Sequence, residues 1–228
     1  MPTANGWLPR EISERRPSSV VMRHAERYPI SSVHDSLGTG LTPKGMTDSA
    51  EFGRSIGGRR QVRLFHSPAV RCRETAMWMA KGLEAAGHSI ISIEESPSLC
   101  APYLTDACVL TDADRLGHGF MRKWFDGSFD PRRLLPTPEA ADMVLSPIIA
   151  DLLSAPEDGL SVHVSHDWEV VLLKEELIGI RHEDAGWADY LSGLVLTLSG
   201  GEIIASSPEG RGAFRFKDGR RRPLEQGP

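Results

Sequence analysis

Residues 18–27 have the sequence SSVVMRHAER, in which a short apolar run leads directly into two arginines that flank a histidine. Apolar residues without alternation are typical of a strand covered on both faces, so we predict a central strand at 18–22. The turn-rich sequence that follows places Arg23, His24 and Arg27 in a loop at the end of this strand. Such a cluster indicates chemistry more than packing, and the remaining sequence is interpreted around it.

Strand and helix patterns alternate along the rest of the chain. We predict further strands at 62–66, 90–93 and 160–165, and helices at 43–56, 68–86, 112–125, 137–153 and 169–178. Two last strands, 193–198 and 202–205, are joined by Ser199-Gly200-Gly201, which is a hairpin signal. This order predicts an α/β fold, a three-layer α/β/α sandwich with a mostly parallel central sheet.

The predicted helix ends carry local signals. Thr42 and Ser67 each precede a proline and are expected to cap the helices that follow them. Pro147 lies inside the helix predicted at 137–153 and is expected to kink or divide it.

The length of 228 residues suits one domain or two small ones. We predict a single domain at 18–217, with an irregular insertion at about 94–138. A flexible arm at 1–17 precedes the predicted domain, and a disordered tail is expected at 218–228.

Composition excludes several classes of protein. A formal net charge of −5 with 40% hydrophobic residues predicts neither a nucleic-acid partner nor a membrane partner. The three cysteines lack metal-ligand spacing and are odd in number, which favours a reducing compartment. No signal peptide and no apolar run of about 20 residues is found, so we expect a cytoplasmic location. A homodimer is compatible with this sequence.

Polar side chains follow three of the predicted strands at the point where each strand ends. They are Arg23, His24 and Arg27 after the first strand, Arg71 after the second, and His166 and Asp167 after the fourth. In sheets of this type ligands bind beyond the carboxyl ends of the strands, so we expect these side chains to share one pocket. The donors of a guanidinium group match the oxygens of a phosphate. Arg71 also lies in the first turn of a predicted helix, where the free N–H groups of the backbone favour an anion. The pattern therefore predicts a site for a phosphorylated small molecule.

A histidine in such a cluster can act as a nucleophile. Neighbouring arginines disfavour its protonation, so the imidazole keeps a free nitrogen lone pair. Attack on phosphorus would give a phosphohistidine, which water then hydrolyses, while the arginines and the second histidine stabilise charge on the phosphoryl oxygens.

These residues resemble the motifs of the histidine phosphatase superfamily, which includes the phosphoglycerate mutases and the histidine acid phosphatases. Four elements are similar in order: Arg23-His24-Ala25-Glu26-Arg27; Leu41-Thr42-Pro43-Lys44-Gly45; Ser67-Pro68-Ala69-Val70-Arg71 with Glu74-Thr75-Ala76; and Val164-Ser165-His166. The resemblance implies a phosphoglycerate mutase-like fold, His24 as nucleophile, and a phosphate pocket of Arg23, Arg27, Arg71 and His166. It also implies a reaction without a metal or another cofactor.

Two departures from the family pattern bear on the site. Ala25 stands where glycine is usual, and we expect the added methyl group to be tolerated. The proton donor is Asp167 if the acid-phosphatase pattern holds, or Glu94 or Glu95 if the mutase pattern holds. We favour Asp167.

Hydrolysis of a phosphate monoester is the function favoured by these residues. The alternatives are a phosphomutase, or a non-catalytic module that binds a phosphorylated ligand on the same fold. The insertion has a basic bias, which indicates either a solvated face or a site for a second anionic group of the substrate; the residues concerned are Arg115, Arg122, Lys123, Arg132 and Arg133.

Overall fold

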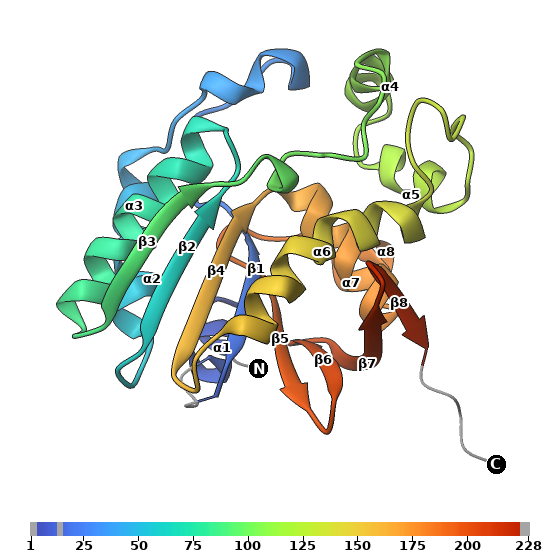
Figure 1. Cartoon of the computed structure of the whole chain (residues 1–228). Coiled ribbons are helices and arrows are strands. Elements are labelled where there is room, and N and C mark those ends of the chain that lie inside the picture. The colour runs from blue at the N-terminus through green and yellow to red at the C-terminus, as the bar shows by residue number, and fades with distance from the viewer. Residues whose placement is uncertain (1–3, 13–15, 224–228) are drawn as a thin grey trace.

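A computed structural model describes residues 4–12 and 16–223 of the chain. Its framework is one eight-stranded sheet with the order β3-β2-β4-β1-β5-β6-β7-β8 (Figure 1). The strands are β1 (Ser18–Arg23), β2 (Gln61–His66), β3 (Ser89–Glu95), β4 (Gly159–Ser165), β5 (Gly193–Ser199), β6 (Glu202–Ser207), β7 (Gly210–Lys217) and β8 (Arg220–Pro223). β1 lies inside the sheet, between β4 and β5, as its apolar sequence predicts.

The prediction of a mostly parallel sheet is wrong for half of the strands. β3, β2, β4 and β1 form a parallel block, whereas β5 to β8 pair antiparallel. Two-residue turns join β5 to β6, β6 to β7 and β7 to β8, and in the first and last of them, Gly200-Gly201 and Asp218-Gly219, both residues have positive φ. Antiparallel strands can be joined by such turns, whereas parallel neighbours need a long crossover. β7 and β8 thus extend the sheet beyond the one hairpin that the sequence predicts.

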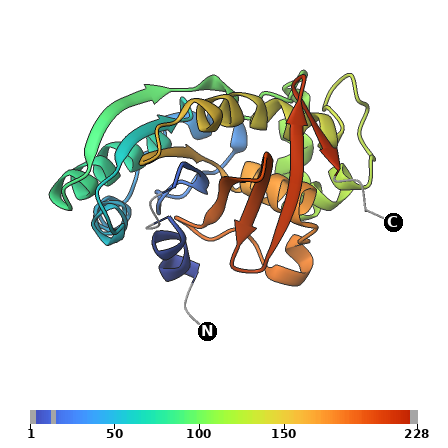
Figure 2. The same ribbon diagram turned by 60° about the horizontal axis from the view of Figure 1, so that its bottom comes forward.

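Helices cover both faces of the sheet (Figure 2). Val20 and Met22 belong to an apolar cluster that includes buried residues of α2 (Pro43–Ser55) and α3 (Val70–Ala85). Val21 belongs to a second cluster, built largely on α6 (Thr137–Ser154) and α7 (Asp167–Ile178). Successive side chains of a strand point to opposite faces, so one apolar run serves two cores. Three layers therefore hold β1 in place.

A helix occupies part of the segment that was expected to be a loose arm. In α1 (Ala4–Glu11) and just after it, Leu8 and Ile12 are buried in the same cluster as Val20 and Met22. The expected disordered tail likewise begins with the turn before β8. Residues 1–3 and 13–15 of the arm, and 224–228 of the tail, lie outside the described residues.

The remaining elements differ from the predicted ones in detail. The insertion holds two short helices, α4 (Cys108–Leu116) and α5 (Gly119–Phe125), separated at Gly117 with φ +54°. α6 continues through Pro147 without division. Short helical turns complete the chain: η1 (Val33–Gly38), η2 (Pro97–Leu99) and α8 (His182–Ala185). None of the described helices has both the length and the apolar character needed to cross a membrane.

Candidate active site

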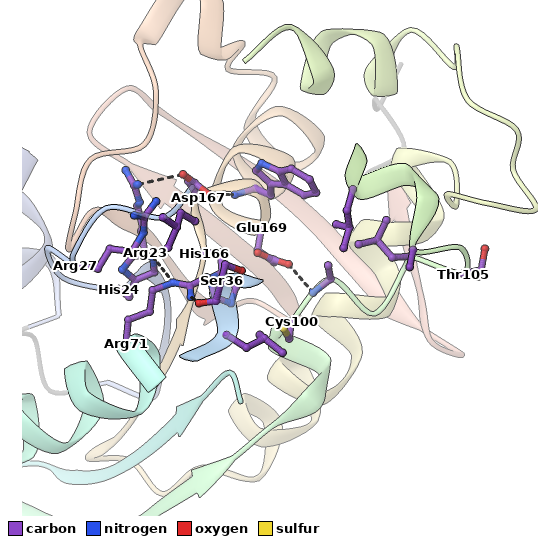
Figure 3. Close-up of a pocket in the computed structure, with 17 residues that line it drawn as sticks. Arg23, His24, Arg27, Ser36, Arg71, Cys100, Thr105, His166, Asp167 and Glu169 are labelled. Atoms are coloured by element: carbon purple, nitrogen blue, oxygen red, sulfur yellow. Dashed lines mark hydrogen bonds and ion pairs between the residues drawn. The ribbon is translucent and has the colours of Figure 1, made fainter. Parts of the chain in front are cut away.

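The ends of β1, β2 and β4 meet at one edge of the sheet. Arg23 lies opposite Ser165 in the β1–β4 pairing, and the amide of His24 donates to Ser165 O (3.0 Å). The amide of Ser67 donates to Val164 O (3.0 Å), which draws the start of α3 to the same place. A cavity of about 510 Å³ opens there (Figure 3). It is lined at one end by the six side chains that we call the phosphate floor: Arg23, His24, Arg27, Arg71, His166 and Asp167.

His24 is held as a neutral imidazole. Its Nδ1 lies 2.7 Å from Ala25 O, and because a carbonyl oxygen only accepts, Nδ1 carries the proton. Its Nε2 accepts a hydrogen bond from Arg71 Nε (3.1 Å). Burial, then the repulsion between the two rings that protonation of both His24 and His166 would cause, and then the positive charge of Arg71 hold the pKa of His24 well below its usual value. Nε2 is therefore unprotonated, and its lone pair points to the Arg71 N–H at the cavity.

Arg71 links the two histidines. Besides its bond to His24, it donates from Nη2 to His166 Nδ1 (3.0 Å) and from Nη1 to Ser36 O (2.5 Å). Since Nδ1 of His166 accepts, its Nε2 donates to Ser67 Oγ (2.8 Å). Burial and Arg71 lower the pKa of His166. Both imidazoles are thus neutral, and Arg71 supplies the positive charge between them.

The hydroxyl of Ser67 does not cap α3 as predicted. The helix begins at Val70, and its N-cap residue, Ala69, has no side-chain bond to offer. Ser67 Oγ instead serves His166, and it accepts a longer bond from Ala69 N (3.4 Å). The Thr42 cap is as predicted: its Oγ1 accepts from Gly45 N (3.0 Å).

The motif residues around His24 hold its loop against α2 and α3. Thr42 Oγ1 donates to Glu26 Oε1 (2.7 Å), and Ala25 N donates to Thr75 Oγ1 (3.0 Å). Gly45 lies so close to the loop that an added Cβ would be 2.0 Å from Glu26 O. Ala25 itself is fully buried in the apolar cluster of β1, so its methyl group is accommodated.

Arg23 and Arg27 approach the cavity differently. Arg23 donates from Nη1 to Ala188 O (2.6 Å), pairs with Asp167 Oδ2 (3.1 Å), and stacks on Tyr190 with 4.2 Å to the ring centroid. Its buried Nε has no hydrogen-bond partner among the described residues. Arg27 is half-buried and donates to Tyr28 O (2.9 Å) while lining the same cavity. Both guanidinium groups thus keep donor capacity for an anion.

Asp167 is ionised in the unliganded site. Burial alone would raise its pKa, but Arg23, the indole N–H of Trp187 and His166 together lower it. Trp187 Nε1 donates to Oδ2 (3.0 Å), and Trp168 N donates to Oδ1 (3.1 Å). An ionised carboxylate accepts protons, so it can donate one only after a ligand has changed this balance.

Glu94 and Glu95 do not reach the cavity. We expect the third strand to end at residue 93, which would leave both glutamates in a loop beyond it. β3 instead continues through Glu95, and both residues are exposed. Glu94 lies 3.8 Å from Arg63, on the outer strands of the parallel block. The structure therefore does not bring the alternative proton donors to His24.

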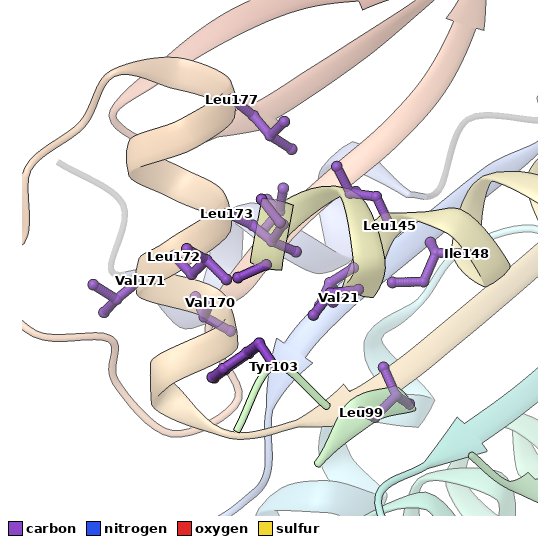
Figure 4. Packing of buried hydrophobic residues seen from close by; sticks show 14 of the residues in the cluster. Val21, Leu99, Tyr103, Leu145, Ile148, Val170, Val171, Leu172, Leu173 and Leu177 are labelled. Carbon is purple, nitrogen blue, oxygen red and sulfur yellow. The ribbon is translucent and has the colours of Figure 1, made fainter. Parts of the chain in front are cut away.

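Sequence reasoning missed Glu169, which lines the cavity two residues after Asp167. It is 1% exposed, and its Oε1 accepts from Ala101 N (2.9 Å) and Tyr103 Oη (3.0 Å). Its Oε2 has no partner within the described residues. Burial raises the pKa of this carboxyl group. Tyr103 is packed in the apolar cluster beside Val170 (Figure 4), so Glu169 is fixed from behind. An acidic residue in a helix start carries no signal of this contact.

One group of side chains within the described part of the chain has the spacing of metal ligands: Glu175, His182 and Glu183. Arg122 donates to Glu175 (2.8 Å) and to Glu183 (2.5 Å), so a guanidinium already balances the two carboxylates. This group does not line the cavity that holds His24. The sequence-based prediction of a reaction without metal is therefore left to a chelator experiment.

No protein-family model matches the sequence, and no curated protein sequence matches it. A mycobacterial glucosyl-3-phosphoglycerate phosphatase is 19% identical with a TM-score of 0.54, over 87% of this chain and 96% of that one. YhfR of Bacillus stearothermophilus is 15% identical with a TM-score of 0.56, over 85% and 96%. A phosphoserine phosphatase variant of Entamoeba histolytica, solved with phosphoserine, is 16% identical with a TM-score of 0.55, over 83% and 95%. These proteins are members of the histidine phosphatase superfamily, and the chain has the fold that they share.

Proposed function

We propose that the protein is a phosphomonoesterase that hydrolyses a small phosphorylated substrate through a phosphohistidine at His24. The observation that carries the proposal is the state of that imidazole. Its proton is fixed on Nδ1 by Ala25 O, and its Nε2 lies beside a guanidinium group at the floor of a cavity. A lone pair held next to a positive charge is suited to attack a phosphoryl group whose oxygens that charge binds.

In the first step the Nε2 lone pair of His24 forms a bond to phosphorus, and the ester P–O bond breaks with its electrons on the leaving oxygen. Asp167 gives that oxygen a proton. In the second step water attacks phosphorus, the P–N bond breaks, and its electron pair returns to Nε2. Asp167 takes the proton of the attacking water, which restores the starting state. Arg23, Arg27 and Arg71 bind the phosphoryl oxygens throughout, and His166 joins them once its Nε2–H leaves Ser67 Oγ.

Asp167 needs the substrate in order to hold a proton. In the unliganded site Arg23 pairs with it and favours its ionised form. A phosphoryl dianion adds negative charge beside Asp167 and competes for Arg23, and both effects raise the pKa of a carboxyl group. Asp167 therefore becomes an acid when the cavity is loaded, which couples proton donation to binding.

The solved structures with the same fold support the reaction class. Two of them are phosphatases that are named for a phosphorylated sugar acid and for phosphoserine. Phosphate release from an ester is the reaction that those names share. We therefore favour hydrolysis over transfer between hydroxyl groups, which requires water to be kept from the phosphohistidine.

Release of phosphate from an aryl phosphate in the presence of a chelator tests the proposal. We expect activity in wild type and its loss in His24→Ala, by about 10⁴-fold or more, as for other catalytic nucleophiles. Quenching during turnover should trap a phosphorylated protein whose label is stable in base and lost in acid, as a P–N bond requires. The melting temperature of the variant serves as the control for folding.

Four outcomes would contradict the proposal in different ways. Activity that survives in His24→Ala would exclude this nucleophile, and activity lost to chelator would exclude a reaction without metal. Isomerisation of a phosphate ester without free phosphate would indicate a mutase. Tight binding of esters with no turnover would indicate a binding module.

A further inference from the structure

The cavity is larger than a phosphoryl group needs. Its volume of about 510 Å³ is that of a site which encloses a whole small molecule, for which about 300–1,000 Å³ is usual. The phosphate floor occupies one end, and Figure 3 places Thr105 at the other. Other lining residues are apolar, and we call six of them the apolar wall: Ile30, Leu37, Leu104, Ala107, Leu110 and Trp168.

The basic residues of the insertion do not serve this cavity. Most of them pair with carboxylates elsewhere: Arg115 with Asp112, Arg122 with Glu175 and Glu183, Arg132 with Asp130, and Arg133 with Asp106. Neither these arginines nor Lys123 line it. Among the described lining residues, the arginines and lysines are Arg23, Arg27 and Arg71, all in the phosphate floor. The structure therefore favours a solvated face for the basic segment over a second anion site.

Glu169 adds a further obstacle to a second anion. Glu169 lines the cavity, and the buried Oε2 of its carboxyl group has no hydrogen-bond partner among the described residues. A carboxylate or a second phosphate of a substrate would lie near the carboxyl group of Glu169. None of the residues of the apolar wall carries a positive charge that could balance it. An uncharged group avoids this repulsion.

Building on the phosphatase activity proposed above, we propose that the substrate is a phosphate monoester of an uncharged, largely apolar alcohol. Its phosphoryl group binds to the floor, and its organic group lies against Leu37, Leu104 and Leu110. Burial of apolar surface against such a wall is favourable because that surface leaves water. The apolar wall thus determines which alcohol is accepted, whereas the phosphate floor binds only the phosphoryl group.

Steady-state kinetics that compare an uncharged alkyl ester with anionic esters test this inference. We expect kcat/KM for hexyl phosphate to exceed that for 3-phosphoglycerate and for phosphoserine by at least about tenfold, which is the usual discrimination by an apolar pocket. Equal or better kcat/KM for the anionic esters would overturn the inference and leave the phosphatase activity standing. No turnover of these esters or of an aryl phosphate would overturn both.

Substitution of the wall gives a second, independent test. Leu110→Arg places a cation in the apolar wall, so we expect kcat/KM for hexyl phosphate to fall about tenfold and that for 3-phosphoglycerate to rise. Leu110→Met keeps the wall apolar and should keep the order of preference. Leu153→Arg is the matched control, since Leu153 is 62% exposed on α6 and does not line the cavity.

Unchanged preference in Leu110→Arg would overturn the placement of the organic group. If that variant is misfolded, both rates fall together with its melting temperature. Leu37→Arg then decides, because Leu37 is already 50% exposed and the change costs less packing. It should reverse the preference in the same direction, and failure to do so would overturn the inference.

Discussion

The phosphate floor and the apolar wall line the same cavity, but they are built in opposite ways. The key side chains of the floor follow strand ends and are tied to backbone oxygens, as Arg71 is to Ser36 O and Arg23 to Ala188 O. The wall takes its residues from η1 and the loop before it, from the segment between η2 and α4, from α4, and from the start of α7. Most of these apolar side chains come together without a shared motif. The comparison shows that the residues expected to perform the reaction belong to short sequence motifs. The residues expected to select the substrate come together only through tertiary packing.

The sharpest way to break this comparison is to change the geometry of the floor while keeping its charge. In Arg71→Lys the three separate bonds to His24, His166 and Ser36 cannot all be made by one ammonium group. We expect kcat/KM for an aryl phosphate to fall by about 10²–10³-fold, as for loss of a transition-state donor. Arg115→Lys, at an exposed pair on α4, is the control. A loss under tenfold would mean that charge alone suffices.

Asp167→Asn asks whether the floor also serves the leaving group. Alkyl leaving groups need a proton and aryl leaving groups need little help, so we expect a loss of about 10²–10⁴-fold on an alkyl phosphate and a much smaller one on an aryl phosphate. The ratio of the two kcat/KM values is the measurement. Equal losses on both esters would remove Asp167 from the role of proton donor.

Gly45→Ala tests how closely the floor depends on the backbone behind it. The new Cβ would lie 2.0 Å from Glu26 O, so the loop or α2 must move. We expect a loss of about 1–3 kcal/mol in the free energy of unfolding, measured in urea, as for other overpacked sites. Gly119→Ala is the control, because nothing lies within 4 Å of a Cβ there. Equal stability of the two variants would contradict the inference that α2 and the loop after β1 are packed too closely at Gly45 for a side chain.

Glu169→Gln is expected to have the smallest effect on stability, and it concerns a residue that lines the cavity outside the phosphate floor. Burial raises the pKa of Glu169 in the folded protein, so its contribution to stability is complete below the unfolded pKa of about 4.3 and is lost as pH rises through the folded value. Glutamine does not titrate, so the variant should gain stability relative to wild type as the pH rises above about 4.3, measured by melting temperature. Glu84→Gln, on the exposed face of α3, controls for removal of one carboxyl group. A difference that does not change with pH would contradict the raised pKa.

The sequence predicts much of the floor because its signals are local. The apolar run before Arg23 marks a strand covered on both faces, and the proline after Thr42 marks a helix start. Because β1, β2 and β4 are parallel, their ends meet at one edge, so the convergence of His24, Arg71 and His166 follows from the order of the elements. The catalytic roles of these residues stay predictions until the variants are measured.

The errors arise where tertiary contacts decide. β3 extends to Glu95 because pairing with β2 continues to His66, and that pairing leaves no trace in the sequence of β3. The antiparallel half depends on three tight turns, of which only Ser199-Gly200-Gly201 stands out. Glu169 reaches the cavity because Ala101 and Tyr103, from a distant segment, hold its carboxyl group. Single residues in helices or loops carry no signal of such contacts.

The position of β4 has a consequence for when the site can exist. Although β1 and β2 come first in the chain, β4 lies between them in the sheet, and it accepts the amides of His24 and Ser67. During synthesis at about 5–20 residues per second, on the order of ten seconds separates the appearance of His24 from that of His166. His24 and His166 can therefore come together only late in synthesis, after β4 has been made and has inserted between β1 and β2.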